Sequence, residues 1–235
     1  MAEDTPAIEV SGLRFRWRAR LAPCLEVDRF AVSRGSRVFL HGESGSGKST
    51  LLNLVAGVLE PEAGSVRVLG EELGRMSGAA RDRFRVDHIG FIFQQFNLVS
   101  YLSVLDNVLL PLRFSPRRAA RAGRGSRALE EVRRLLAGLD LDPAAAHRVA
   151  AELSVGEQQR VAVARALIGG PEIVIADEPT SSLDAARQQA FIDLLAAECE
   201  RGSATLLFVS HDLRLAEPFG CRVALAQINR AGATR

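Results

Sequence analysis

The stretch Gly42-Glu43-Ser44-Gly45-Ser46-Gly47-Lys48-Ser49-Thr50 decides how this sequence folds. It has the spacing GxxxxGK[ST], in which glycines let the backbone curl so that successive N–H groups point at phosphate oxygens. The short apolar run Arg37–His41 before it predicts a buried strand, and Ser49–Val58 after it has the apolar spacing of a buried helix. Because a strand leads in and a helix leads out, we predict that the loop binds a nucleoside triphosphate, through Gly42, Ser44, Gly45, Ser46, Gly47, Lys48, Ser49 and Thr50.

The loop holds the only lysine of the chain, since every other basic residue among the 30 Lys and Arg is arginine. An arginine bias of this kind makes a retained lysine informative, because a compact ammonium fits a tight phosphate cradle better than a planar guanidinium does. We expect Lys48 to reach the terminal phosphates. We expect the hydroxyl of Ser49 to ligate Mg²⁺.

The composition places the chain among ordinary globular proteins. Its 235 residues are 47% hydrophobic and 25% charged, enough for one α/β domain or a core with a small subdomain. The net charge of +2 gives no electrostatic case for nucleic acid as a partner, and three well-separated cysteines argue against a disulfide framework or a thiolate metal site. No signal-peptide core and no run of about 18 apolar residues is present, so we expect a cytosolic chain that meets a membrane only through a partner.

Strand-like and helical segments alternate along the chain. Further strands are predicted at Ile8–Arg18, Leu25–Val32, Ser65–Leu69, Ile89–Phe93, Glu172–Ala176 and Thr205–Ser210, and helices at Leu153–Leu167 and Gln188–Glu200. This order predicts an α/β fold with a mainly parallel sheet. The segment 97–151 has a helical pattern with breaks at Pro111, Pro116, 123–125 and Pro143. We therefore expect a single domain with a core of about 1–94 and 159–235 and an inserted helical subdomain of about 95–158.

Within the helical segment, Arg113–Arg134 contains eight arginines and two glutamates. Such a segment is either a solvated helix face or a surface that contacts anionic lipid head groups or an acidic partner.

Two carboxylates, Asp177 and Glu178, follow the apolar run Glu172–Ala176. In an open α/β sheet, ligands bind at the carboxyl ends of the strands. Asp177 is then placed to hold the magnesium hydration shell. Glu178 is placed to polarise the attacking water as a general base.

A second anion-binding geometry is predicted at Leu153-Ser154-Val155-Gly156-Glu157-Gln158-Gln159-Arg160, where a hydroxyl and backbone N–H groups lie at a helix start. An ordinary capped helix with Ser154 at its start is the alternative. One active site does not need two such cradles for a single γ-phosphate. A pair of chains would use both anion-binding sites, if the helix start of each chain closes over the nucleotide bound by its neighbour.

Taken together, these motifs resemble the nucleotide-binding subunit of ABC transporters over roughly residues 8–225. The resemblance implies the P-loop NTPase fold, with helices on both faces of the parallel sheet and an antiparallel N-terminal β subdomain. It implies a head-to-tail dimer that binds two ATP with Mg²⁺. Ser154 and Gly156 would contact the γ-phosphate held by the partner copy. Gln94 in FIFQQFNL matches the glutamine that senses the metal and the attacking water. The resemblance also assigns the switch histidine that contacts γ-phosphate to His211 and the dimer interface to Asp184, within the D-loop 181–184.

The family also places an aromatic ring before the phosphate loop, where it stacks on adenine. Trp17, the only tryptophan, lies in the matching region. Phe15 is the alternative, and Trp17 would otherwise be a strand residue of the core.

Two features of the motif 153–160 distinguish this chain from the usual family pattern. Val155 stands where the family has glycine, and its branched side chain narrows the backbone choices, so we hypothesise slow hydrolysis. The sequence GEQQR, together with FNL after Gln94, is typical of the branch with lipoprotein-releasing, macrolide-efflux and cell-division-associated ATPases.

The resemblance implies an ATPase that drives a separate integral membrane permease from the cytoplasmic face of the inner membrane, and no nucleic acid partner. The alternative is an ATPase that signals to, or remodels, a membrane partner without moving cargo. An ABC ATPase of DNA repair or translation would usually carry two cassettes or a long insertion, and a P-loop kinase would lack the motif 153–160 and His211. The cargo and its direction are properties of the permease, which this sequence does not contain.

Overall fold

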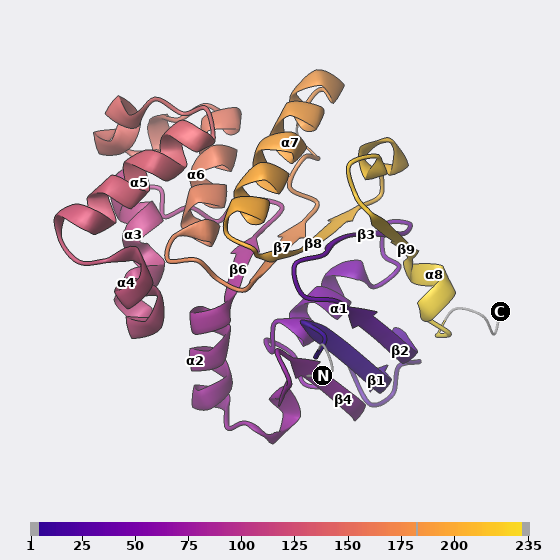
Figure 1. Cartoon of the computed structure of the whole chain (residues 1–235). Helices are drawn as coiled ribbons and strands as arrows, with labels where there is room; N and C mark the ends of the chain where they lie inside the picture. The colour runs from indigo at the N-terminus through magenta and orange to yellow at the C-terminus, as the bar shows by residue number, and fades with distance from the viewer. Residues whose placement is uncertain (1–4, 182, 232–235) are drawn as a thin grey trace. The chain divides into compact units, whose positions relative to one another are not determined.

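The computed structural model describes residues 5–181 and 183–231, which divide into two compact units (Figure 1). The first unit takes the described residues up to Arg85 and from Leu207 onward, and the second runs from Val86 to Leu206. The division leaves the proposed helical subdomain of about 95–158 inside the second unit.

An antiparallel sheet with the order β2-β1-β4-β5 forms one part of the first unit (Figure 1). Its strands are β1 Ile8–Phe15, β2 Leu25–Val32, β4 Ala63–Val68 and β5 Glu71–Glu72. The buried residues of β1 change from even to odd positions along the strand, and the pairing register with β4 shifts between Ser11 and Arg14. A β-bulge of this kind moves the apolar side chains of the second half onto the same face as those of the first.

Parallel strands form the other part of the first unit. β3 (Arg37–His41) pairs with β9 (Cys221–Ala224), and β8 (Thr205–Ser210) borders β3 on its other side. The rings of Phe39, Phe208 and Phe219 pack together with centroids 5.2 to 5.8 Å apart. Helix α1 (Lys48–Val55) begins where the loop after β3 ends, so the buried strand fixes the start of the predicted phosphate loop.

The remaining short elements are η1 Leu73–Arg75, α2 Gly78–His88, η4 Leu213–Ala216 and α8 Leu225–Ile228. The sequence analysis did not predict them. Helix α2 was missed because only Arg81 among its residues is buried, so the helix has no apolar stripe.

In the second unit, β6 (Ile89–Ile92) pairs in parallel with β7 (Ile173–Asp177). The helices are α3 Val104–Phe114, α4 Pro116–Ala122, α5 Ser126–Gly138, α6 Val155–Leu167 and α7 Ala185–Arg201, with the short helices η2 Pro143–His147 and η3 Ala150–Glu152. Helices α3 to α6 pack on one another (Figure 1). Helix α6 also packs on β6, where a Cβ on Gly90 would lie 2.3 Å from the carbonyl oxygen of Ala166. Glycine is therefore required at that position for the helix to approach the strand.

The α/β class, the parallel strand pairs and the antiparallel N-terminal sheet agree with the prediction. The predicted break at Pro111 is wrong, because α3 continues through it to Phe114. The helix is fixed ahead of the proline by the fully buried Asn107, whose amide donates to the carbonyl oxygens of Val99 and Ser103 at 3.0 Å. Three residues after the proline, the helix ends.

Candidate active site

The loop 42–50 uses glycine where its backbone is left-handed. Gly45 and Gly47 have φ of 77° and 105°, a region that other residues rarely adopt. A Cβ on Gly47 would also lie 3.0 Å from Cδ2 of Leu25 and 3.4 Å from the carbonyl oxygen of Cys24. Helix α1 begins at this glycine with no side-chain cap. An anion at this helix start would be favoured by the helix dipole.

Lys48 is only 5% exposed and lies against the backbone of its own loop. Its Nζ donates to the carbonyl oxygens of Gly42 and Glu43 at 2.9 and 2.8 Å. Among the described residues, the Oγ of Ser46 is buried without a hydrogen-bond partner, and a Cβ on Gly42 would lie 2.9 Å from it. A buried hydroxyl without a partner costs about 1–3 kcal/mol, which a phosphate oxygen would relieve. The loop therefore fits the group that its sequence predicts.

The other residues of the loop differ in exposure. Ser49 is exposed on the first turn of α1, where its hydroxyl is accessible to a metal ion, whereas Thr50 is buried. Ser44 is exposed at the tip of the loop.

Trp17 and Phe15 differ in exposure. Trp17 is 58% exposed, whereas Phe15 is 8% exposed and meets the indole edge-on with centroids 5.3 Å apart. Trp17 is thus not a core residue, and of the two rings it is the one with an accessible face. The stacking of Trp17 on adenine remains a prediction.

His211 follows β8 directly, in the same unit as the loop 42–50, and is exposed. The chain turns just after it, because the N–H of Asp212 donates to Oγ of Ser210 at 3.1 Å and a carboxylate oxygen of Asp212 accepts from the N–H of Arg214 at 3.1 Å. This turn directs the chain away from the strand end and leaves the imidazole accessible.

In the second unit, Asp177 ends β7 and Glu178 follows it, both half-buried. Glu178 has a φ of 44°, a left-handed backbone that costs about 1–3 kcal/mol in a residue with a side chain. Two glutamines hold the chain that follows. Gln159 Nε2 donates to the carbonyl oxygen of Pro179 at 2.8 Å, and Gln188 Nε2 donates to that of Thr180 at 3.1 Å.

Gln94 is exposed in the loop after β6, which then turns sharply through Phe96 and Asn97, with φ of 59° and 49°. Arg165 of α6 donates to the carbonyl oxygens of both residues, to that of Asn97 at 2.6 Å. Burial lowers the pKa of the Arg165 guanidinium below its ordinary value. One arginine of α6 therefore fixes the turn that presents Gln94.

Ser154 and Gly156 lie at the start of α6. Ser154 Oγ accepts from the N–H of Glu157 at 3.3 Å, and the Glu157 carboxylate accepts from the N–H of Ser154 at 2.7 Å, a capping box. Hydrogen bonds to its carboxylate from the backbone N–H and from the side chain of Ser154, followed by the contact with Arg148, hold the pKa of Glu157 below its ordinary value. The alternative of an ordinary capped helix is thus correct for the local structure.

The capping box of Ser154 and Glu157 does not fill the space beside the start of α6. A pocket of about 680 Å³ is lined by residues of the motif 153–160 and by residues near the start of α7, including Leu183, Arg187 and Phe191. No atom lies within 4 Å of where a Cβ on Gly156 would be, and Val155 is 49% exposed. The helix start therefore faces open space that a ligand of another chain could enter.

Asp184 caps α7, because a carboxylate oxygen accepts from the N–H of Arg187 at 3.0 Å. The carboxylate is 59% exposed and also pairs with the Arg187 side chain at 3.2 Å. Within the predicted D-loop, Ser182 lies outside the described residues.

The predicted site residues thus belong to two groups. Trp17, the loop 42–50 and His211 lie in the first unit, and Gln94, Ser154, Gly156, Asp177, Glu178 and Asp184 lie in the second. The sequence analysis missed Gln159 and Arg165, both on α6. No sequence pattern marks them, because their partners are backbone carbonyl oxygens that any residue could supply.

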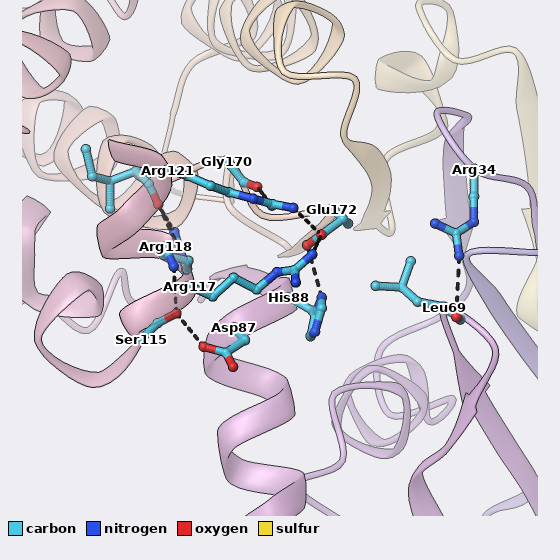
Figure 2. A network of polar contacts seen from close by, with 11 residues as sticks. Arg34, Leu69, Asp87, His88, Ser115, Arg117, Arg118, Arg121, Gly170 and Glu172 are labelled. Atoms are coloured by element: carbon cyan, nitrogen blue, oxygen red, sulfur yellow. Dashed lines mark hydrogen bonds and ion pairs between the residues drawn. The ribbon is translucent and has the colours of Figure 1, made fainter. Parts of the chain in front are cut away.

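Figure 2 shows what the arginines of Arg113–Arg134 do in the second unit. Arg118 is 2% exposed and donates to the carbonyl oxygens of Ala166 and Ile168, at the end of α6. Arg117 and Arg121 pair with Glu172 at 2.6 and 2.7 Å. Several of these arginines therefore stabilise the fold rather than line a free basic surface.

Glu172 also contacts His88 Nδ1, at 3.1 Å (Figure 2). Burial by itself would raise the pKa of Glu172. The hydrogen bonds from His88, Arg121 and Arg117 outweigh burial and hold that pKa well below its ordinary value. In the first unit, the figure shows the contact from Arg34 to the carbonyl oxygen of Leu69, at 3.4 Å.

The family model described as "ABC transporter" matches residues 25–181. The chain is 43% identical to the uncharacterised ABC transporter ATP-binding protein YbbA of Escherichia coli K12, over 79% of this chain and 78% of that one. It is 41% identical to the lipoprotein-releasing system ATP-binding protein LolD of Anaeromyxobacter dehalogenans, over 92% and 90% of the two chains. A solved dimer of the ATP-binding cassette MJ0796, in a post-hydrolysis state with ADP and Pi, superposes with a TM-score of 0.82 at 32% identity, over 92% of this chain and 93% of that one.

Proposed function

We propose that two copies of this chain, arranged head to tail, enclose each ATP between them. The chain belongs to the ABC transporter family and is a subunit that binds and hydrolyses ATP. The loop 42–50 of one copy would hold the phosphates, and Ser154 and Gly156 of the other would close over the γ-phosphate. The observation that carries the proposal is the open pocket of about 680 Å³ beside the start of α6, which a single chain does not use. A helix start of this kind favours an anion.

Each predicted residue has a role in this arrangement. Lys48 and the N–H groups of the loop bind the β- and γ-phosphates, and Trp17 stacks on the adenine. Glu178 accepts a proton from the attacking water as the general base. Gln94 and His211 orient the water and the γ-phosphate. Asp184 contacts the second copy.

The proposed arrangement would include a magnesium ion, because Mg²⁺ is usually held by one or two protein oxygens together with substrate phosphates. Ser49 supplies a hydroxyl, Asp177 a carboxylate and Gln94 an amide oxygen. When bound, the ion neutralises the charge that develops on the phosphate oxygens.

The chain works with a membrane permease, as the ATP-binding subunits of this family do. Among the described residues, no helix combines the length and the apolar character that a membrane crossing requires. We place the subunit at the cytoplasmic face of the inner membrane, held there by the permease. We further propose that residues of about 95–158 act as a helical subdomain within one ATPase domain.

The test is the variant Glu178→Gln, which keeps the shape of the side chain and removes the base. We expect it to bind ATP as the unchanged protein does, to hydrolyse it at least about 100-fold more slowly, and to form a stable dimer with ATP. Hydrolysis is measured by phosphate release and dimerisation by size-exclusion chromatography with light scattering. Gln189→Met serves as the control, because among the described residues Gln189 Nε2 donates only to the carboxylate of Asp193 on the same helix, α7. Hydrolysis at the normal rate by the Glu178 variant would show that another group is the base.

A further inference from the structure

We propose that Gln159 is a positioning residue for the general base: it holds the backbone at Pro179 and thereby aims the carboxylate of Glu178. The inference rests on the proposed role of Glu178. Gln159 lies in the middle of α6 and is 1% exposed, yet its side chain is polar. Glutamine is seldom buried to this extent without a specific partner.

That partner is the carbonyl oxygen of Pro179, which accepts from Gln159 Nε2 at 2.8 Å within the second unit. Pro179 directly follows Glu178. The amide therefore acts one peptide bond away from the residue that carries the base.

The backbone of Glu178 needs such a restraint. Its φ of 44° is left-handed, which costs free energy in any residue with a Cβ. The next residue is proline, whose ring favours an extended backbone in the residue before it. A backbone that is unfavourable in both respects persists only where the surrounding structure holds it. The hydrogen bond from Gln159, together with that from Gln188 to Thr180, supplies the restraint.

Helix α6 is a rigid support for this amide. The capping box of Ser154 and Glu157 fixes its start, and Arg118 binds the carbonyl oxygens of Ala166 and Ile168 at its end. Close packing of Gly90 against Ala166 fixes it against β6. Gln159 lies five residues after Ser154, or about 7.5 Å along the helix. The element that meets the nucleotide of the partner copy thus also aims the base.

Loss of the amide should affect the chemical step and leave ATP binding unchanged. Gln159 itself binds neither the phosphates nor the adenine in the proposed arrangement, so the KM for ATP should not change. A carboxylate displaced by about 1 Å loses on the order of 10- to 100-fold in kcat. A split of this kind, with kcat lowered and KM constant, indicates an interaction used in the transition state.

The experiment compares Gln159→Met, which keeps the volume and removes the donor, with the control Gln189→Met. Steady-state hydrolysis is measured with the dimeric protein well below the unfolding midpoint of each variant. We expect kcat to fall about 10- to 100-fold for Gln159→Met, with KM unchanged, and to stay normal for the control. Gln188→Met, which releases only the carbonyl of Thr180, should show a smaller loss in kcat and gives a second measurement if the first variant folds poorly.

A double-mutant cycle shows whether Gln159 acts through Glu178. If it does, Gln159→Met should have no further effect on the residual single-turnover rate of Glu178→Gln. Equal losses in both backgrounds, an unchanged kcat, or a raised KM would each overturn the inference. Normal hydrolysis by Glu178→Gln alone would instead overturn the assignment of the base, so the two failures are distinguishable.

Discussion

Replacing Arg118 by methionine removes the guanidinium that fixes the end of α6. The side chain is 2% exposed, and it donates from Nε to the carbonyl oxygen of Ile168 at 2.8 Å and from Nη2 to that of Ala166 at 2.6 Å. Burial, opposed by nearby carboxylates, lowers the pKa of Arg118 to about 10. The guanidinium therefore remains charged at neutral pH, and both hydrogen bonds are charge-assisted.

The size of the effect follows from these contacts. Hydrogen bonds to a charged group contribute about 1.5–3 kcal/mol each, so the two losses sum to about 3–6 kcal/mol. Methionine recovers part of this, because burying a guanidinium carries a desolvation cost that the variant avoids. We expect Arg118→Met to lower the free energy of unfolding by about 3 kcal/mol.

Urea unfolding followed by circular dichroism measures this change, with Arg117→Met as the matched control. Arg117 is on the same helix and pairs with Glu172 at 2.6 Å, but its side chain is 44% exposed. A pair of this kind contributes at most about 1 kcal/mol and weakens with salt, whereas the contribution of Arg118 should persist at 0.5 M salt because it is buried. A loss below about 1 kcal/mol for Arg118→Met, or one that salt removes, would refute this reasoning.

Three further outcomes follow from the structure. Lys48→Ala should weaken ATP binding at least about 10-fold in titration calorimetry, since a charge-assisted contact to phosphate is lost, and Lys48→Arg should not restore it; unchanged affinity would contradict the role of Lys48. Val155→Gly should raise steady-state hydrolysis if the branched side chain hinders closure over the partner's nucleotide; no gain would count against that hypothesis. Because the pKa of Glu172 is depressed in the folded state, the stability that its carboxylate contributes should be complete above about pH 4.3 and be lost as the pH falls further. Between pH 7 and pH 3, the melting temperature of Glu172→Gln should therefore fall less steeply than that of the unchanged protein. Equal slopes for the two proteins would exclude this contribution.

The sequence by itself determined the parts of the protein whose chemistry is local. The strands Leu25–Val32, Arg37–His41 and Thr205–Ser210 have the predicted bounds, because apolar periodicity reports burial directly. The loop 42–50 was also predictable, since left-handed backbone at Gly45 and Gly47 and the need for a compact cation limit each position to one or two residue types.

Pro111 shows where local reasoning failed. The proline predicted a helix end, but α3 is anchored ahead of it by the buried Asn107, which binds the backbone at Val99 and Ser103, and the helix continues to Phe114. The cost of a proline in a helix is a few kcal/mol, which packing and hydrogen bonds elsewhere in the helix can offset.

Only the tertiary structure decided which side chains support the site. Gln159, Arg165 and Arg118 bind backbone carbonyl oxygens 20, 69 and 50 residues away, at Pro179, Phe96 and Ile168. Every residue has a carbonyl oxygen, so such a partner leaves no mark in the sequence. A contact between distant segments becomes visible only when the fold brings them together. The sequence therefore predicted the groups that would meet ATP, and the structure identified side chains that hold the backbone around them.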